Sequence, residues 1–186
     1  IKDIIAYLSV VNNPNDSVRL RRIINEPKRG LGDVTVDALL EISSQLGVPP
    51  LEVMRGAENY PKLQRRAETL KNFCAMMQNL AETAEQEPLE VLFDTVLEQS
   101  GYMDMLVLQG FEGQTRIENI EELRSSIIKF SDEMPEGTLS DFLEEIALYT
   151  DLDRTDLQDD AVLMMTMHSA KGLEFPYVFL AGCEEG

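Results

Sequence analysis

The sequence predicts a mainly α-helical protein with two short β-strands at its C-terminal end. Along most of its 186 residues, apolar side chains recur every three or four positions between turn-forming residues, as in amphipathic helices. Only AVLMMTMH (161–168) and YVFLAG (177–182) are continuous apolar runs bounded by turn residues, which is typical of buried parallel strands. Because two strands are too few for a stable sheet, we expect them to complete a sheet formed mostly by other parts of a longer protein.

Four helices are predicted in the N-terminal third of the chain. They are expected at residues 1–11, 17–25, 35–46 and 50–55, where apolar residues share one face. NNPND (12–16) ends the first helix, and EPKRGLGD (26–33) is a loop between the second and the third. Thr35 is expected to cap the third helix at its start, and Gly47 to close it.

The longest helix and two shorter ones are predicted in the middle of the chain. They are expected at residues 61–86, 88–101 and 102–108. In the longest helix, Leu63, Leu70 and Met77 are seven residues apart, and Cys74 lies in a second apolar row beside them. We therefore expect Cys74 to be a small core residue rather than a reactive thiol.

Two further helices and a linker are expected after residue 110. Thr115-Arg-Ile-Glu118 matches a capping box, which predicts that a helix begins there and continues through Phe130. MPEGTLSD (134–141) is a break, and Leu139, Phe142, Leu143 and Ile146 form one face of a last helix. The acidic DLDRTDLQDD (151–160) is expected to be a solvated linker, because it lacks the Gly and Glu that an EF-hand loop requires.

The composition indicates a globular, cytoplasmic protein. Hydrophobic residues make up 44% and charged residues 27% of the chain. No apolar run approaches the ~20 residues needed to span a bilayer, and no secretory signal opens the sequence. Cys74 and Cys183 lie far apart without a CxxC or Cys/His cluster, so neither a disulfide framework nor a zinc site is expected.

The net charge of −18, taken alone, disfavours nucleic-acid binding, because that binding depends on Lys and Arg. The charge is unevenly distributed, however. Residues 1–35 hold six of the 16 basic residues but only four of the 34 acidic ones. This segment is therefore the expected place for contact with a polyanion. The alternative is a solvated acidic surface with a few ordinary arginines.

The residue types and their spacing do not predict a complete catalytic site. The chain has no GxxxxGK[ST] phosphate loop, and His168 is its only histidine, which excludes a multi-histidine metal site. Thr166 to Glu174 would place short polar groups at the carboxyl end of a strand, where ligands bind in open α/β sheets; the alternative is a structural βα turn. In the segment 28–32, KRGLG, backbone N–H groups could approach a phosphate; the alternative is an ordinary interhelical turn.

Four segments in this order resemble the UvrD/PcrA/Rep family of superfamily 1A DNA helicases, and the PcrA-type enzymes most. They are IKDIIAYLSVVNNPND, RRIINEPKRGLGD, GQTRIENIEEL and VLMMTMHSAKGLEFPYVFLAGCEEG, the last of which resembles helicase motif V and its following strand. The resemblance covers nearly the whole chain. It implies that residues 1–155 are the helical subdomain 2B and that residues 156–186 are a fragment of the RecA-like motor domain 2A.

The family's functional residues map onto two places in this chain. At motif V, the resemblance implies that Lys171, Gly172 and Glu174 bind ATP, Glu174 through the ribose. Thr166 and His168 would lie near single-stranded DNA and couple it to the ATP site.

At the other place, the resemblance implies that residues 28–32 form the turn through which 2B contacts duplex DNA. The expected contact residues are Lys28, Arg29, Gly30, Leu31, Gly32 and Thr35. Val34 stands where relatives often have a polar or basic residue. The segment GQTRIENIEEL is assigned to structure, on the ground of its capping box.

The resemblance implies that the parent protein is an ATP-dependent 3′–5′ DNA helicase that acts in repair and replication. It would use ATP and Mg²⁺, with Walker motifs upstream and motif VI downstream. The segment present here is expected to be inactive alone, with no catalytic residue, metal or bound cofactor. Its expected partners are DNA at a duplex/single-strand junction, domains 1A, 1B and 2A, and repair or replication proteins, with no membrane partner. Two alternatives remain open, a regulatory protein-interaction module and part of a recombination helicase–nuclease.

Overall fold

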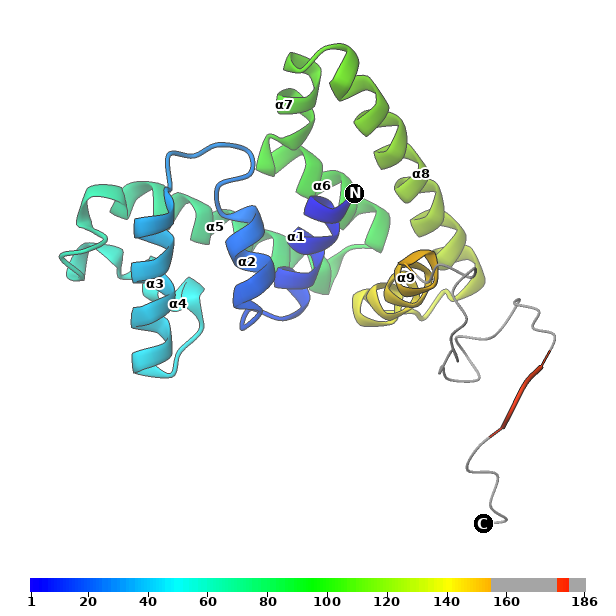
Figure 1. Ribbon diagram of the computed structural model, residues 1–186, viewed down its shortest axis with the longest axis horizontal. Coiled ribbons are helices and arrows are strands. Elements are labelled where there is room, and N and C mark those ends of the chain that lie inside the picture. The colour runs from blue at the N-terminus through cyan, green and yellow to red at the C-terminus, as the bar shows by residue number, and fades with distance from the viewer. Residues whose placement is uncertain (155–176, 181–186) are drawn as a thin grey trace. The chain divides into compact units, whose positions relative to one another are not determined.

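The computed structural model of the chain describes residues 1–154 and 177–180, with side chains for residues 1–148 and 177–180. The described helices are α1 (Lys2–Asn12), α2 (Ser17–Ile23), α3 (Asp33–Leu46), α4 (Pro50–Arg55), α5 (Ala67–Gln86), α6 (Leu89–Ser100), α7 (Tyr102–Leu108), α8 (Phe111–Glu133) and α9 (Leu139–Arg154), with two 3-10 turns, η1 (Ala57–Asn59) and η2 (Gln64–Arg66), before α5 (Figure 1). The chain divides into two compact units, Ile1–Glu144 and Glu145–Gly186, and α9 passes from one to the other.

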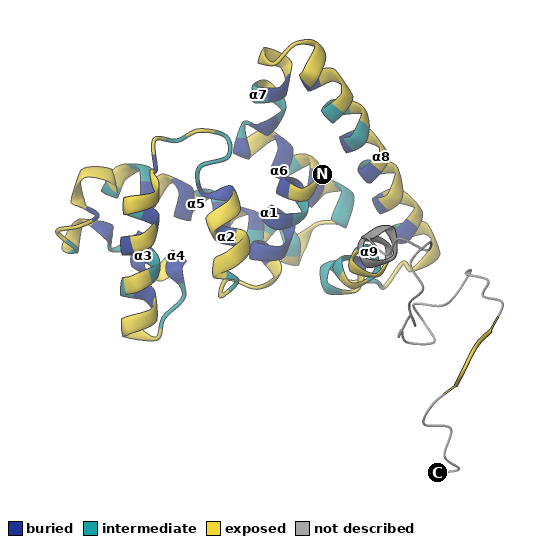
Figure 2. Ribbon diagram, viewed as in Figure 1, coloured by how far each residue is buried: buried dark blue, intermediate teal, exposed yellow. Residues whose placement is uncertain are grey.

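The core of the first unit is centred on α1, which packs against α2, α5 and α6. Ile4, Tyr7 and Leu8 on this helix are completely buried. Figure 2 shows α1 almost entirely buried, whereas α2 and α3 each expose one face. The mainly helical class predicted from the apolar periodicity is therefore confirmed for the described residues.

The apolar rows of the long helix are also confirmed. Leu63, Leu70 and Met77 are buried, and so is Cys74, whose thiol donates to the Leu51 carbonyl oxygen at 3.2 Å. Burial raises the pKa of this thiol, which keeps it protonated and unreactive. The prediction that Cys74 is a small core residue is correct.

The capping box predicted at residues 115–118 is wrong. The helix α8 begins earlier, at Phe111, after the positive-φ residue Gly110, so residues 115–118 already lie inside it. A reciprocal cap occurs instead at the start of α9. There the Thr138 N–H donates to Asp141 Oδ2 at 2.8 Å, and the Asp141 N–H donates to Thr138 Oγ1 at 3.3 Å. The Thr138 hydroxyl, which donates to Asp141 Oδ2 at 2.7 Å, and next the Thr138 N–H lower the pKa of the Asp141 carboxyl.

Several other helix boundaries differ from prediction; α2, for example, ends at Ile23 rather than at residue 25. The long helix begins at Ala67, because the chain first makes the η2 turn. The helix α3 begins at Asp33 with Gly32 as its N-cap, so Thr35 lies inside the first turn instead of capping it. Residues 151–154, expected in the acidic linker, continue α9, and residues 155–160 lie outside the described residues.

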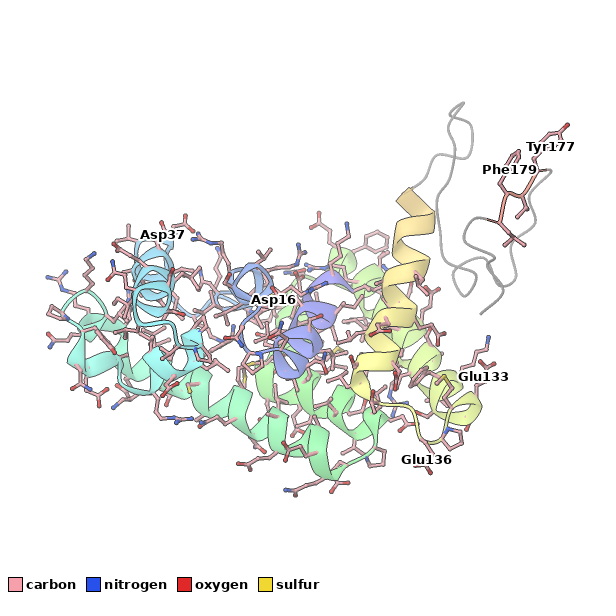
Figure 3. The ribbon with its side chains drawn as sticks, turned by 90° about the horizontal axis from the view of Figure 1, so that it is seen from below. Asp16, Asp37, Glu133, Glu136, Tyr177 and Phe179 are labelled. Carbon is pink, nitrogen blue, oxygen red and sulfur yellow. The ribbon has the colours of Figure 1, made fainter. Side chains whose placement is uncertain are left out.

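The two expected β-strands are not shown. Residues 161–168 lie outside the described residues, as do 181 and 182. Residues 177–180 are described, and they form no strand. Tyr177 and Phe179 are 85% and 94% exposed (Figure 3). A strand requires a paired neighbour, and residues 177–180 have none among the described residues.

The segment GQTRIENIEEL serves structure, but through contacts other than a cap. Gly113 brings α8 against the end of α7, where a Cβ atom on this glycine would lie 1.9 Å from the Leu106 carbonyl oxygen. Arg116 Nη2 donates to the Tyr102 hydroxyl at 2.7 Å, and the Arg116 guanidinium lies 5.7 Å from the centroid of that ring. Both residues therefore fix the packing of α7 against α8.

A buried carboxylate connects this corner to the N-terminal helices. Asp3 is only 8% exposed. Its Oδ2 accepts from the Tyr102 hydroxyl at 2.6 Å and from Arg116 Nη2 at 3.4 Å, and its Oδ1 accepts from Arg22 Nε at 2.6 Å. Burial, and next the hydrogen bond to Asp3, raise the pKa of Tyr102, so this hydroxyl stays a donor. Four helices thus share one carboxylate.

We expect Asp3→Asn to lower the free energy of unfolding by about 2 kcal/mol, measured by denaturant titration at neutral pH. The amide keeps the shape but leaves the two arginines without a carboxylate. The loss is smaller than for a fully buried pair, because both arginines are partly exposed. The control is Asp37→Asn at a residue labelled in Figure 3; it removes the exposed ion pair with Arg21 and should cost less than about 1 kcal/mol. Equal effects of the two variants would contradict the role of Asp3.

Candidate nucleic-acid interface

The loop between α2 and α3 is held in shape by one side chain. Asn25 Oδ1 accepts from the N–H of Arg29 at 2.8 Å and from the N–H of Leu31 at 3.2 Å. Leu31 is only 1% exposed, so its side chain anchors the loop in the core. The peptide bond between Glu26 and Pro27 is cis. The loop therefore has a defined inner side, made by Asn25 and Leu31.

Arg29 belongs to this inner side. Its Nη1 donates to the carbonyl oxygens of Ile23 and Pro27, both at 3.1 Å. Its Nη2 donates to the Tyr7 hydroxyl at 2.7 Å and to the Ser100 carbonyl oxygen at 3.0 Å. Sequence reasoning placed this side chain on duplex DNA, whereas the structure directs both terminal nitrogens at the protein.

The surroundings of Arg29 are partly apolar. Its Cζ lies 5.2 Å from the centroid of the Phe73 ring on α5, within the range of a cation–π interaction. Burial raises the pKa of Tyr7 to about 12, although the neighbouring guanidinium acts in the opposite direction. Tyr7 therefore stays protonated, accepting from Arg29 and donating to the Glu26 carbonyl oxygen at 2.8 Å. Arg29 thus joins the loop to α1, α5 and the end of α6.

The outer side of the loop presents backbone N–H groups. Gly30 and Gly32 are exposed, and Gly30 has a φ of +73°, which favours glycine. Within residues 1–154, no acceptor pairs with the N–H groups of Gly30, Gly32, Asp33 or Val34. The space around Gly32 is open, since a Cβ atom there would meet nothing within 4 Å. Four backbone donors are thus available to a ligand on this side.

The basic side chains around this turn differ in availability. Lys28 is exposed and makes no ion pair with a described residue. Thr35 is half-buried in the first turn of α3, where its N–H donates to the Gly32 carbonyl oxygen at 2.9 Å. Of the predicted duplex-contact residues, the structure therefore leaves Lys28, Gly30 and Gly32 accessible. It turns Arg29 and Leu31 inward.

Sequence reasoning missed two residues at this turn. Asn25 shapes the loop, and the tendency of Asn to bond nearby backbone N–H groups is a signal that could have identified it. Arg66 comes from η2, and its Nη1 lies 3.6 Å from where a Cβ atom on Gly30 would stand. Because Arg66 is 36 positions away from Gly30 in the sequence, no local pattern predicts this approach.

The other predicted site lies outside the described residues. Thr166, His168, Lys171, Gly172 and Glu174 all fall between residues 155 and 176. Among the residues that are described, no group of three His, Cys, Asp or Glu side chains could hold a metal ion. No helix in that part of the chain is long and apolar enough to cross a membrane.

Comparison with known proteins found similarity along the whole chain. The family profile of the UvrD-like helicase C-terminal domain matches residues 1–186. The chain is 40% identical over 194 residues to the ATP-dependent DNA helicase PcrA of Leuconostoc citreum, and 35% identical over 193 residues to that of Bacillus subtilis (strain 168). Each alignment covers 100% of this chain and 26% of the relative. The chain thus spans about a quarter of the length of the curated relatives that it matches.

Proposed function

The chain belongs to the family of UvrD-like helicase C-terminal domains, and from this membership we propose that it is part of an ATP-dependent 3′–5′ DNA helicase of the UvrD/PcrA type. In this proposal, residues 1–155 are subdomain 2B and residues 156–186 are a fragment of motor domain 2A. The apolar runs 161–168 and 177–182 would then be strands of the 2A sheet, paired with strands contributed by the rest of the parent protein.

Motif V is proposed to couple ATP to single-stranded DNA. Lys171, Gly172 and Glu174 would lie on the nucleotide side of the loop, and Thr166 and His168 on the DNA side. The parent enzyme would use ATP with Mg²⁺, and closure of the cleft between its motor domains would move the strand. These residues act only together with domains 1A, 1B and 2A, so no hydrolysis is expected of residues 1–186 alone.

Duplex DNA is proposed to bind at the outer side of the α2–α3 loop. The observation that carries this proposal is the exposed turn with four free N–H groups, beside an unpaired Lys28. N–H groups and a lysine complement phosphate oxygens. Phosphate contacts carry no base information, so the binding is independent of sequence. Gly30 and Gly32 allow close approach because they have no side chain.

Arg29 and Leu31 then have a positioning role. Their side chains fix the inner side of the loop, which keeps the glycine N–H groups directed outward. Thr35 remains a proposed flanking contact from the first turn of α3. The acidic body of the chain would orient the duplex toward the turn by repelling it elsewhere.

The variant Gly32→Asp tests this site without damaging the fold. Gly32 is the N-cap of α3, and Asp is a favoured N-cap, so the free energy of unfolding should stay unchanged or rise by roughly a few tenths of a kcal/mol. The added carboxylate would occupy the free N–H groups and repel phosphate. We expect affinity for a labelled blunt-ended duplex, measured by fluorescence anisotropy at low salt, to fall about tenfold or more.

Gly32→Ala is the matched control, because it adds a side chain in open space without charge and should bind nearly as the wild type does. Unchanged duplex affinity in Gly32→Asp would place the contact elsewhere. Absence of duplex binding by the wild-type chain would favour the protein-interaction alternative. The exposed Val107, Leu108 and Phe111 at the α7–α8 corner would then be the first surface to examine.

A further inference from the structure

The side chain of Arg66 lies over the outer side of the glycine turn. Its Nη1, Cζ and Nη2 are 3.6, 3.8 and 3.9 Å from where a Cβ atom on Gly30 would stand. These nearly equal distances show that the whole guanidinium group, rather than one nitrogen, faces this glycine. Arg66 is exposed, and its side chain makes no hydrogen bond or ion pair with any described residue. The donors of its guanidinium group are therefore available.

Arg66 is a basic residue without an ion pair in an acidic chain. Acidic residues outnumber basic ones 34 to 16. Most lysines and arginines with described side chains are in ion pairs, on Asp3, Asp16, Asp37, Glu41, Glu58, Asp94 or Glu133. Lys28 and Arg66 are two of the six that are not, the others being Lys2, Arg29, Arg55 and Arg65. Lys28 and Arg66 both lie near Gly30, so two basic side chains without an ion pair stand beside the free N–H groups.

Arg66 adds a positive charge beside the turn. Within residues 26–33, Lys28 and Arg29 are matched in number by Glu26 and Asp33. Without Arg66, these four charges sum to zero. The guanidinium of Arg66 beside Gly30 adds a positive charge that favours an anion there.

We propose that Arg66 is a second phosphate-binding residue of the duplex site, contributed by η2 and acting with Lys28 across the Gly30 turn. This inference rests on the proposed function and extends its interface from the α2–α3 loop to the segment before α5. The ligand is the phosphodiester backbone of duplex DNA. A planar guanidinium can donate two parallel hydrogen bonds to one phosphate, so it can bind the phosphodiester backbone beside the N–H groups of the turn.

The test compares Arg66→Gln and Arg66→Lys with the wild-type chain in duplex binding by anisotropy over a range of chloride concentrations. Arg66→Gln is expected to weaken binding about tenfold at low salt and to reduce the slope of log affinity against log salt by about one. Arg66→Lys should keep the slope, because it keeps the charge. Duplexes of unrelated sequence should be affected equally.

Lys129→Gln on α8 is the control for loss of one positive charge. Figures 1 and 3 both show α8 and α3 on opposite sides of α1. For Lys129→Gln, the slope of log affinity against log salt should match that of the wild type. If Arg66→Gln keeps the wild-type affinity and slope while Gly32→Asp loses binding, the assignment of Arg66 is wrong. The assignment of the glycine turn as the duplex site is then retained. If neither variant changes binding, or the wild type does not bind, the duplex site itself is wrong.

Discussion

Gly113→Ala is expected to lower the free energy of unfolding by about 3 kcal/mol, as measured by denaturant titration. The added Cβ atom would stand 1.9 Å from the Leu106 carbonyl oxygen and 2.8 Å from its carbon. Both are backbone atoms of α7, so no side chain can move aside. The two helices must separate, and the contacts between Arg116 and Tyr102 across them must weaken as well.

The sign of the change in stability distinguishes a steric clash at Gly113 from the effect of helix propensity. Helix propensity alone predicts that alanine stabilises α8 by about 1 kcal/mol relative to glycine. Gln114→Ala is the neighbouring control, since Gln114 is exposed on the same helix and should change stability by less than about 0.5 kcal/mol. A stabilised Gly113→Ala variant would show that the approach of α7 to α8 is not tight in solution.

Arg29→Ala is expected to lower the free energy of unfolding by a similar amount, about 3 kcal/mol. The substitution removes hydrogen bonds to the Tyr7 hydroxyl and to the carbonyl oxygens of Ile23, Pro27 and Ser100. It also removes the contact with the Phe73 ring. Arg29→Lys should recover less than half of the loss, because one ammonium cannot reach acceptors arranged for a planar fork.

Arg19→Ala is the control for Arg29→Ala. The Arg19 side chain is half-exposed and bonds only to Asp16, so its removal should cost less than about 1 kcal/mol. If Arg29→Ala unfolds at the same denaturant concentration as the wild type, the inward bonds have no energetic weight, and a direct DNA contact becomes the better explanation. A loss of both stability and DNA binding identifies Arg29 as a positioning residue.

The helical organisation could be predicted from the sequence because periodicity and glycine stops are local signals. Gly47 and Gly101 close α3 and α6 with positive φ angles, as turn chemistry requires. The motif that resembles a capping box at residues 115–118 gave a wrong start, because the same letters occur inside helices. The reciprocal cap at Thr138 and Asp141 has Asp in place of the usual Glu or Gln.

The candidate site could be predicted only in part. Its location was predictable, since a basic glycine turn stands out in an acidic chain and the family resemblance points to it. The roles of individual side chains were not. Whether Arg29 points to solvent or to Ser100 depends on a residue 71 positions away, and the approach of Arg66 likewise depends on how α5 packs. Such long-range geometry leaves no pattern in a local segment.

The inward bonds of Arg29 also determine where mechanical load goes. In the proposed helicase, a duplex held at the Gly30 turn would pull on the loop whenever the motor moved the other strand. A loop attached only through its ends would peel away under that tension. Here one guanidinium links the loop to Tyr7 on α1 and to Ser100 at the end of α6, against Phe73 on α5. Such a pull would therefore be shared among three helices at once.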